Sequence, residues 1–293
     1  MQLSFELGTL DPDLAEHACF ECGAISVTLL DARDDAVLEP LPGEVRLWPA
    51  TCVLSLFSGD ADAACAAAVL GAALGIRVAD IEVTWIEDRA WEREWLNDFH
   101  AMRFGKRLWI CPSHEPVTAP EAVTVQLDPG LAFGTGTHPT TALCLEWLDS
   151  SIRGGEHVID YGCGSGILAI AAVKLGAQQA HCVDIDSQAL LATEQNARTN
   201  GVESRITVHP DADTLPQVEL LLANILSAPL CELARCFGAH VHAGGRIVLA
   251  GLLAHQAGDV TEAYSPWFDM SSFGDREGWV ALAGTRRLPV PRS

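Results

Sequence analysis

The chain has 293 residues, a length that predicts about two domains, and its 49% hydrophobic content excludes an intrinsically disordered protein. The formal net charge of −21 argues against a nucleic-acid substrate, because phosphate binding needs clustered lysine and arginine. This negative charge favours binding of a basic partner. An equal alternative is that the acidic residues serve only to keep the protein soluble. The sequence has no apolar run long enough for a membrane span and no basic start typical of a secretory signal.

The ten cysteines are scattered, and several lie within apolar runs, where cysteine usually acts as a small buried hydrophobe. Cys19 and Cys22 form a CxxC pair without a second pair or a histidine spacing to complete a zinc site, so we expect no metal. This cysteine usage is typical of a reducing compartment. We therefore expect a cytoplasmic protein without a membrane partner, working as a monomer.

Residues 1–87 are predicted to form a small α+β domain. Expected strands cover residues 2–7, 24–31, 45–48, 52–57 and 81–86, with Pro49 at an edge or bulge. Asp11 and Pro12 begin one expected helix, and an alanine-rich helix runs from a cap at Asp60 to Gly75. The order β-α-β-β-α-β is typical of a ferredoxin-like domain.

Residues 88–124 have a different composition. The segment 88–99, DRAWEREWLNDF, predicts a helix with Trp91 and Trp95 on one face, and a proline-rich stretch follows at 112–122. We interpret this region as a linker helix and connecting segment, and the two tryptophans as packing residues.

From residue 125 to 293, short apolar strands alternate with helices, which predicts a doubly wound, Rossmann-like parallel sheet. Helix caps are expected at Thr140 or Thr141, at Ser187, and at Gly201 as the end of the helix that Ser187 begins. Residues 267–287 predict two strands around a GDREG turn, and so an antiparallel hairpin at the edge of the sheet.

The turn from Asp160 to Gly166, between a predicted strand and helix, is the position where a nucleotide-type ligand meets the backbone. Its glycines, Gly162, Gly164 and Gly166, follow G-x-G-x-G and not the dinucleotide spacing G-x-G-x-x-G. This spacing resembles the first motif of class I methyltransferases and predicts S-adenosylmethionine as the cofactor. Asp184, at the end of the second strand, is expected to accept hydrogen bonds from the ribose hydroxyls of the cofactor. Asp186 is the alternative residue for this role. NAD enzymes also have an acidic residue at this position, so the acid alone does not distinguish the two cofactors.

Asn224 follows the fourth strand, whose end faces the same crevice, so its side chain can position the acceptor amine. The alternative is a turn or helix-entry residue. Residues 127–141, rich in glycine and threonine, predict either a flap that excludes water from the site or a structured interdomain loop. His138 is a weaker catalytic candidate, as a proton acceptor, because a single loop histidine carries little information.

Four segments together resemble the bacterial methyltransferase family that modifies large-subunit ribosomal protein L11. They are 127–141, LDPGLAFGTGTHPTT; 158–177, VIDYGCGSGILAIAAVKLGA; 183–186, VDID; and 223–226, ANIL. The segment 88–113 also looks like that family's interdomain region. The resemblance covers nearly the whole chain and is weakest over residues 1–80.

The resemblance implies an N-terminal domain that recognises the ribosomal protein and a C-terminal class I methyltransferase domain. By matching motif positions, it implies donor contacts at Thr141, Gly162, Asp184 and Asn224. The implied acceptors are lysine ε-amines and the N-terminal α-amine of L11. Ribosomal proteins are typically basic, so the negative charge of this chain would attract such a substrate.

Three rival functions remain. One is a methyltransferase for another protein or a small amine; the ANIL segment differs from the Asn-Pro-Pro-aromatic motif of amide- and adenine-methylating relatives and argues against planar nitrogens. An NAD oxidoreductase is disfavoured by the glycine spacing. A ribosomal-protein binder without catalysis is disfavoured by the intact glycines, Asp184 and Asn224.

Overall fold

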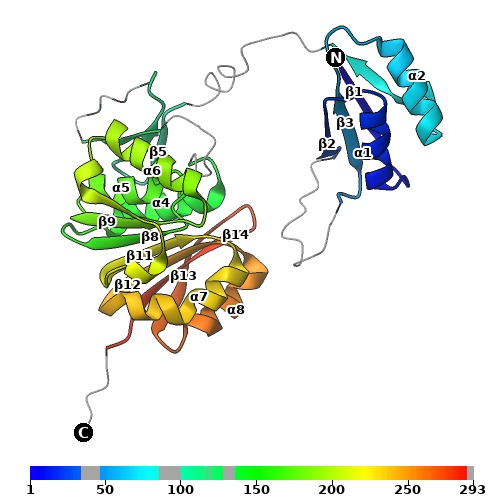
Figure 1. Cartoon of the computed structure of the whole chain (residues 1–293). Helices are drawn as coiled ribbons and strands as arrows, with labels where there is room; N and C mark the ends of the chain where they lie inside the picture. The colour runs from blue at the N-terminus through cyan, green and yellow to red at the C-terminus, as the bar shows by residue number, and fades with distance from the viewer. Residues whose placement is uncertain are drawn as a thin grey trace. The chain divides into compact units, whose positions relative to one another are not determined.

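The structure of the protein, a computed structural model, describes residues 1–33, 47–85, 100–115, 117, 119, 121–127 and 136–288. The chain divides into two compact units, Met1–Ala90 and Trp91–Ser293, which are described separately (Figure 1). In the described part of the chain, no helix is both long and apolar enough to cross a membrane.

The first unit is a four-stranded antiparallel sheet with two helices. Its elements are β1 (Gln2–Glu6), α1 (Pro12–Glu21), β2 (Ser26–Asp31), β3 (Thr51–Leu56), α2 (Ala63–Leu74), a short 3-10 turn (Val78–Asp80) and β4 (Glu82–Thr84). The strand order is β2-β3-β1-β4, and every pair is antiparallel. Leu3 and Val53 of the sheet share one core with Cys19 of α1 and Leu70 of α2. The predicted ferredoxin-like arrangement is therefore confirmed.

Local capping explains where the two helices of this unit begin. The Asp11 side chain accepts a hydrogen bond from Leu14 N at 3.0 Å, which confirms the expected start of α1. The cap expected at Asp60 was wrong, because Asp60 accepts from the Ser58 hydroxyl while Asp62 accepts from the first amides of α2. Gly75 ends α2 with a φ of 69°, as predicted.

The strand predicted around Pro49 is shorter than expected. Leu47 and Trp48 are not in a strand, residues 45 and 46 lie outside the described residues, and β3 begins at Thr51. The last predicted strand also shortens to Glu82–Thr84.

The region predicted to be a linker contains two strands. The helix predicted at 88–99 lies outside the described residues, but β5 (Met102–Phe104) and β6 (Leu108–Cys111) pair with β7 (Val123–Gln126) in a three-stranded sheet. Leu108 and Ile110 are fully buried. The carboxylate of Asp149, on α4 (Pro139–Ser151), accepts from Lys106 N at 2.6 Å and Arg107 N at 3.2 Å, so it holds the β5–β6 turn. These strands are therefore part of the packed second unit.

The second unit is built on a seven-stranded sheet in the order β10-β9-β8-β11-β12-β14-β13. Its strands are β8 (His157–Tyr161), β9 (Gln179–Val183), β10 (Ile206–His209), β11 (Val218–Asn224), β12 (Val241–Leu253), β13 (Phe268–Arg276) and β14 (Trp279–Arg286). Strands β8 to β12 pair in parallel, and β14 is antiparallel to both β12 and β13. This confirms a doubly wound sheet with an antiparallel edge hairpin.

Helices cover both faces of this sheet (Figure 1). One core contains residues of α4 (Pro139–Ser151), α5 (Ile167–Leu175) and α6 (Ser187–Thr199), and the other contains residues of α7 (Ser227–His240) and α8 (Ala257–Tyr264). The strand order reverses between β8 and β11, so a crevice is expected outside the carboxyl ends of these two strands.

Two caps near this crevice differ from prediction. His138 and not Thr140 or Thr141 caps α4, because Pro139 occupies the first helical position and places the cap one residue earlier. Asp186 and not Ser187 caps α6, since its carboxylate accepts from Gln188 N at 2.9 Å. Gly201, with a φ of 64°, follows the C-cap Asn200, the position where a left-handed glycine commonly ends a helix, as expected.

Candidate functional site

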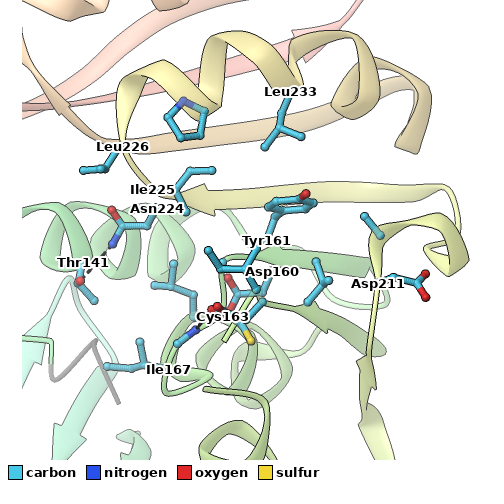
Figure 2. Close-up of a pocket in the computed structure, with 18 of the residues that line it drawn as sticks. Thr141, Asp160, Tyr161, Cys163, Ile167, Asp211, Asn224, Ile225, Leu226 and Leu233 are labelled. Atoms are coloured by element: carbon cyan, nitrogen blue, oxygen red, sulfur yellow. Dashed lines mark hydrogen bonds between the residues drawn. The ribbon is translucent and has the colours of Figure 1, made fainter. Parts of the chain in front are cut away.

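A cavity of about 630 Å³ lies at the carboxyl ends of β8, β9 and β11, where the strand order reverses (Figure 2). Five of the predicted site residues line it: Thr141, Gly162, Gly164, Asp184 and Asn224. This volume falls in the range of small-molecule sites. The residues come from four separate segments, so only the fold brings them together.

The glycine turn is bonded into the protein through its own amides. Gly162 N and Cys163 N donate to Val183 O at 2.8 and 3.2 Å, and Gly164 N donates to Asp184 Oδ2 at 2.9 Å. Both Gly162 and Gly164 have positive φ, 74° and 53°, which L side chains rarely adopt. A phosphate cradle needs free amides aimed at the ligand. This turn therefore supplies shape and close approach, but it lacks the free amides that a pyrophosphate would require.

Two carboxylates lie beside the turn. Asp184 accepts from Gly164 N and, through Oδ1, from Asp186 N at 3.0 Å, which leaves lone pairs of both oxygens for a ligand. Asp160, at the end of β8, is 1% exposed and accepts from Ala169 N at 3.0 Å. Burial and the nearby charge of Asp184 raise the pKa of Asp160 to about 7, against the opposing effect of that hydrogen bond. A cationic ligand would stabilise both carboxylates, whereas a pyrophosphate would be repelled.

The wall of the cavity beyond Asp184 is largely apolar. Ile185 is fully exposed there, and Ala212 and Leu233 line the same cavity. An exposed isoleucine on a cavity wall is suited to contact the flat face of a nucleobase. Asp211 adds a hydrogen-bond acceptor at this end.

Thr141 and Asn224 meet at the other side of the cavity. Asn224 Nδ2 donates to Thr141 Oγ1 at 3.2 Å, which orients the amide as the dashed line in Figure 2 shows. The Asn224 Oδ1 atom has no hydrogen-bond partner among the described residues, so it is available to accept from a ligand. Thr141 is itself buried on α4, and its position is fixed by that helix.

Two predicted site residues lie outside the cavity lining. Gly166 begins α5 with a φ of 77°, and a Cβ there would lie 2.8 Å from Thr193 Cγ2, so this glycine allows α5 and α6 to pack closely. His138 caps α4: its Nδ1 accepts from Thr140 N at 3.3 Å and lies 2.7 Å from Thr140 Oγ1. Burial lowers the pKa of His138, and the Glu277 charge raises it by a smaller amount. The structure thus gives both residues structural roles, and proton transfer by His138 remains a prediction.

Sequence reasoning missed other residues near the site. Asp160 was visible as an acid near the end of β8, but the sequence did not reveal its burial. Trp279 packs edge-on against His138, with ring centroids 4.9 Å apart, beside the helix that carries Thr141. No local pattern connects Trp279 with the site, because its position depends on β14 lying between β12 and β13.

The family model described as ribosomal protein L11 methyltransferase (PrmA) matches residues 1–287. The chain belongs to the ribosomal protein L11 methyltransferase family. It is 50% identical over 273 residues to the ribosomal protein L11 methyltransferase of Actinobacillus pleuropneumoniae serotype 5b, over 91% of this chain and 92% of that protein. The ribosomal protein L11 methyltransferase of Methylococcus capsulatus is 51% identical over 285 residues, 95% of this chain and 97% of that protein.

A solved structure supports the same assignment. The ribosomal protein L11 methylase from Lactobacillus delbrueckii subsp. bulgaricus has a TM-score of 0.60 at 31% identity, over 65% of this chain and 100% of that chain. The ribosomal protein L11 methyltransferase family is a class I methyltransferase family, whose methyl donor is S-adenosylmethionine. The predicted cofactor is therefore confirmed, and the bonded glycine turn and the two carboxylates fit a cationic sulfonium donor.

Proposed function

We propose that this protein transfers methyl groups from S-adenosylmethionine to lysine ε-amines and the N-terminal α-amine of ribosomal protein L11. One observation in the site supports a cationic methyl donor. The amides of Gly162, Cys163 and Gly164 all donate hydrogen bonds within the protein, and two carboxylates lie beside them. Such a site selects against a dinucleotide and for a cation. Family membership supports the acceptor.

Each part of the cavity suits one part of the donor. In this proposal Asp184, which lines the cavity, accepts hydrogen bonds from the ribose hydroxyls, and Ile185 contacts the adenine face. Gly162 and Gly164 allow the amino-acid portion of the donor to approach the backbone closely. The ionised Asp160 carboxylate favours the donor's positive charge. Thr141 and Asn224 lie where the reacting methyl group would meet its acceptor.

The bound donor supplies an activated methyl group on a sulfonium, so the residues must chiefly place a neutral amine in line with it. A lysine ammonium must first lose a proton to water, since its ordinary pKa is about 10.4. Removal of water from the site favours the neutral amine. Asn224 Oδ1 can then accept from an N–H of the amine and aim the nitrogen lone pair at the methyl carbon. With the donor bound, the amine nitrogen would take the methyl group as the C–S bond breaks, and the electron pair of that bond would stay on sulfur.

We further propose that the first unit recognises the ribosomal protein through the face of its sheet opposite α1 and α2. Along β3, the inward residues include Thr51 and Ser55, while the outward residues Cys52, Leu54 and Leu56 are all apolar. An outward face of an antiparallel sheet is normally polar when it meets water. An apolar row there supports the idea that this face is covered by a partner.

Charge indicates which partner fits. Leu54 pairs with Ser4 of β1, and Glu6 and Glu82 lie on the same outward side as the apolar row, close enough to Cys52 to raise its pKa, after the larger effect of burial. In the described residues of this unit, Arg33 and Arg77 are the only arginines and no lysine is present. An apolar strip bordered by carboxylates suits a basic protein surface. The cytoplasmic location and the monomeric state remain predictions.

The decisive experiment mixes the purified enzyme, labelled S-adenosylmethionine and purified L11, and locates added methyl groups by mass spectrometry. Label on lysine side chains and on the N-terminal amine is expected. Binding of S-adenosylhomocysteine without any transfer to L11 would instead indicate a non-catalytic binder. Label only on another protein of a ribosomal extract would overturn the proposed acceptor.

A further inference from the structure

The β13–β14 turn holds a residue in an unfavourable backbone conformation. Glu277 has a φ of 54° and is the non-glycine residue with positive φ in the described part of the chain. It is followed by Gly278, with a φ of 81°, and the pair joins Arg276 to Trp279 across the hairpin. Two-residue turns with positive φ at both positions favour asparagine or aspartate followed by glycine. A glutamate at the first position is therefore strained.

The contacts of Glu277 do not compensate for this strain. Its side chain is exposed and forms no hydrogen bond or ion pair with the described residues. The neighbouring Arg276 is already paired, with its Nη2 atom 2.9 Å from Glu146 Oε1. Strained residues that persist without a structural reason tend to lie at functional sites.

The turn lies at the same end of the sheet as the donor cavity. Ala254 N donates to Gly278 O at 3.0 Å, which fixes the turn at the carboxyl end of β12. Trp279 packs against His138, the cap of the helix that places Thr141 in the cavity. Glu277 lies two residues before Trp279 in the chain, and its charge raises the pKa of His138, against the larger lowering by burial, so its carboxylate lies near this cap. Glu277 is thus next to the acceptor side of the site without lining the cavity.

We propose that Glu277 is a specificity-determining residue that draws the cationic amine of the substrate to the acceptor side of the cavity, beside Trp279. This inference rests on the proposed function, in which the acceptor is a lysine or N-terminal amine. A carboxylate at the reacting position would keep the amine protonated and prevent transfer. Outside the cavity it instead attracts the ammonium form, which gives its proton to water as the amine moves into the water-poor site. The indole of Trp279 adds a face that attracts cations, including methylated amines.

The turn geometry provides a matched pair of variants. Glu277→Asp and Glu277→Asn both introduce a residue that tolerates the left-handed conformation, and they differ only in charge. Both are expected to raise the melting temperature by roughly 2 °C, since they relieve the same strain. Glu277→Asn should lower kcat/KM for L11 roughly three- to fivefold at low salt, which is the effect of losing one exposed ion pair. Glu277→Asp keeps the charge and should retain most of the wild-type kcat/KM.

Several readouts separate this role from a structural one. The difference between the two variants should shrink as ionic strength rises, because salt screens exposed charges. Affinity for S-adenosylhomocysteine, measured by calorimetry, should equal that of the wild type in both. Glu203→Gln, which removes a glutamate at the opposite end of the sheet, serves as the charge control and should leave kcat/KM unchanged. Equal kcat/KM for the Asn and Asp variants would overturn the proposal. Failure of the proposed function would be distinct, because the wild-type enzyme would then not methylate L11.

Discussion

Gly164 N donates a hydrogen bond to Asp184 Oδ2 at 2.9 Å, so the glycine turn after β8 and the acid after β9 form one bonded unit. The bond uses the amide that a phosphate would need and holds the carboxylate at the cavity wall. One contact therefore both disfavours a dinucleotide and positions the group expected to bind ribose. This hydrogen bond gives a physical reason why the G-x-G-x-G turn does not suit a dinucleotide.

Asp184→Ala should weaken donor binding by roughly 10- to 100-fold, the effect of losing hydrogen bonds to a charged group. Calorimetric titration with S-adenosylhomocysteine measures this directly. Asp186→Ala is the matched control: it removes the α6 cap and should cost about 1 kcal/mol of stability, with donor affinity retained. Equal losses of affinity in the two variants would mean that the effect comes from helix structure and not from the Asp184 carboxylate.

Donor binding should release protons near pH 7, because Asp160 has a pKa of about 7 in the free protein and the cationic donor favours its ionised form. Affinity should therefore rise as the pH increases through 7. Titrations in buffers of different ionisation enthalpy give the number of protons released. The Asp160→Asn variant should release fewer protons, and an unchanged number would assign the release to another group.

The same carboxyl group should affect stability in the opposite sense. Its folded-state pKa lies above the ordinary value of 3.8, so the folded protein binds more protons than the unfolded chain between about pH 4 and pH 7. Its contribution is fully present below pH 4 and is lost as the pH rises through 7. Denaturant titrations across this range should show a flatter pH dependence for Asp160→Asn than for the wild type.

The sequence predicted the features that depend on local pattern. Alternating apolar strands and helices identified the doubly wound sheet, and the Asp11–Pro12 pair correctly marked the start of α1. Caps at neighbouring acids or hydroxyls were less reliable, since Asp60 and Asp62 both suit a cap and only the backbone geometry selects one. The short strands β5 and β6 were missed because a three- or four-residue alternation resembles a connecting segment.

The candidate site was predictable only as far as its residues follow strand ends. Gly162 and Asp184 come directly after strands of the parallel sheet, and Asn224 is the last residue of another, so the fold class alone places them together. The environment of Asp160 depends on burial, and that of Trp279 on the insertion of β14 beside β12. Both arise from tertiary packing, which a local pattern does not contain.

Thr141→Val should lower kcat more than it weakens donor binding. The valine keeps the buried volume but removes the oxygen that accepts from Asn224 Nδ2 at 3.2 Å, so the amide of Asn224 is no longer oriented. The loss of one hydrogen bond corresponds to about a fivefold decrease in kcat, measured with L11 at saturating donor. Thr199→Val, which removes an exposed hydroxyl of α6, is the control and should behave as the wild type. A decrease that appears only in donor affinity would place Thr141 in donor binding and not in positioning Asn224.

Leu54→Arg tests the outward face of the first unit. The substitution places a cation in the apolar row between Cys52 and Leu56, so it should raise KM for L11 by about tenfold or more through lost apolar burial and charge repulsion. Affinity for S-adenosylhomocysteine should not change, because the donor cavity belongs to the second unit. Val69→Arg, at an exposed apolar position on α2, is the control for adding the same charge to the helical side. If both variants raised KM equally, the effect would reflect the overall charge of the unit, and the outward face would lose its proposed role. If Leu54→Arg left KM unchanged, the apolar row would serve a different partner.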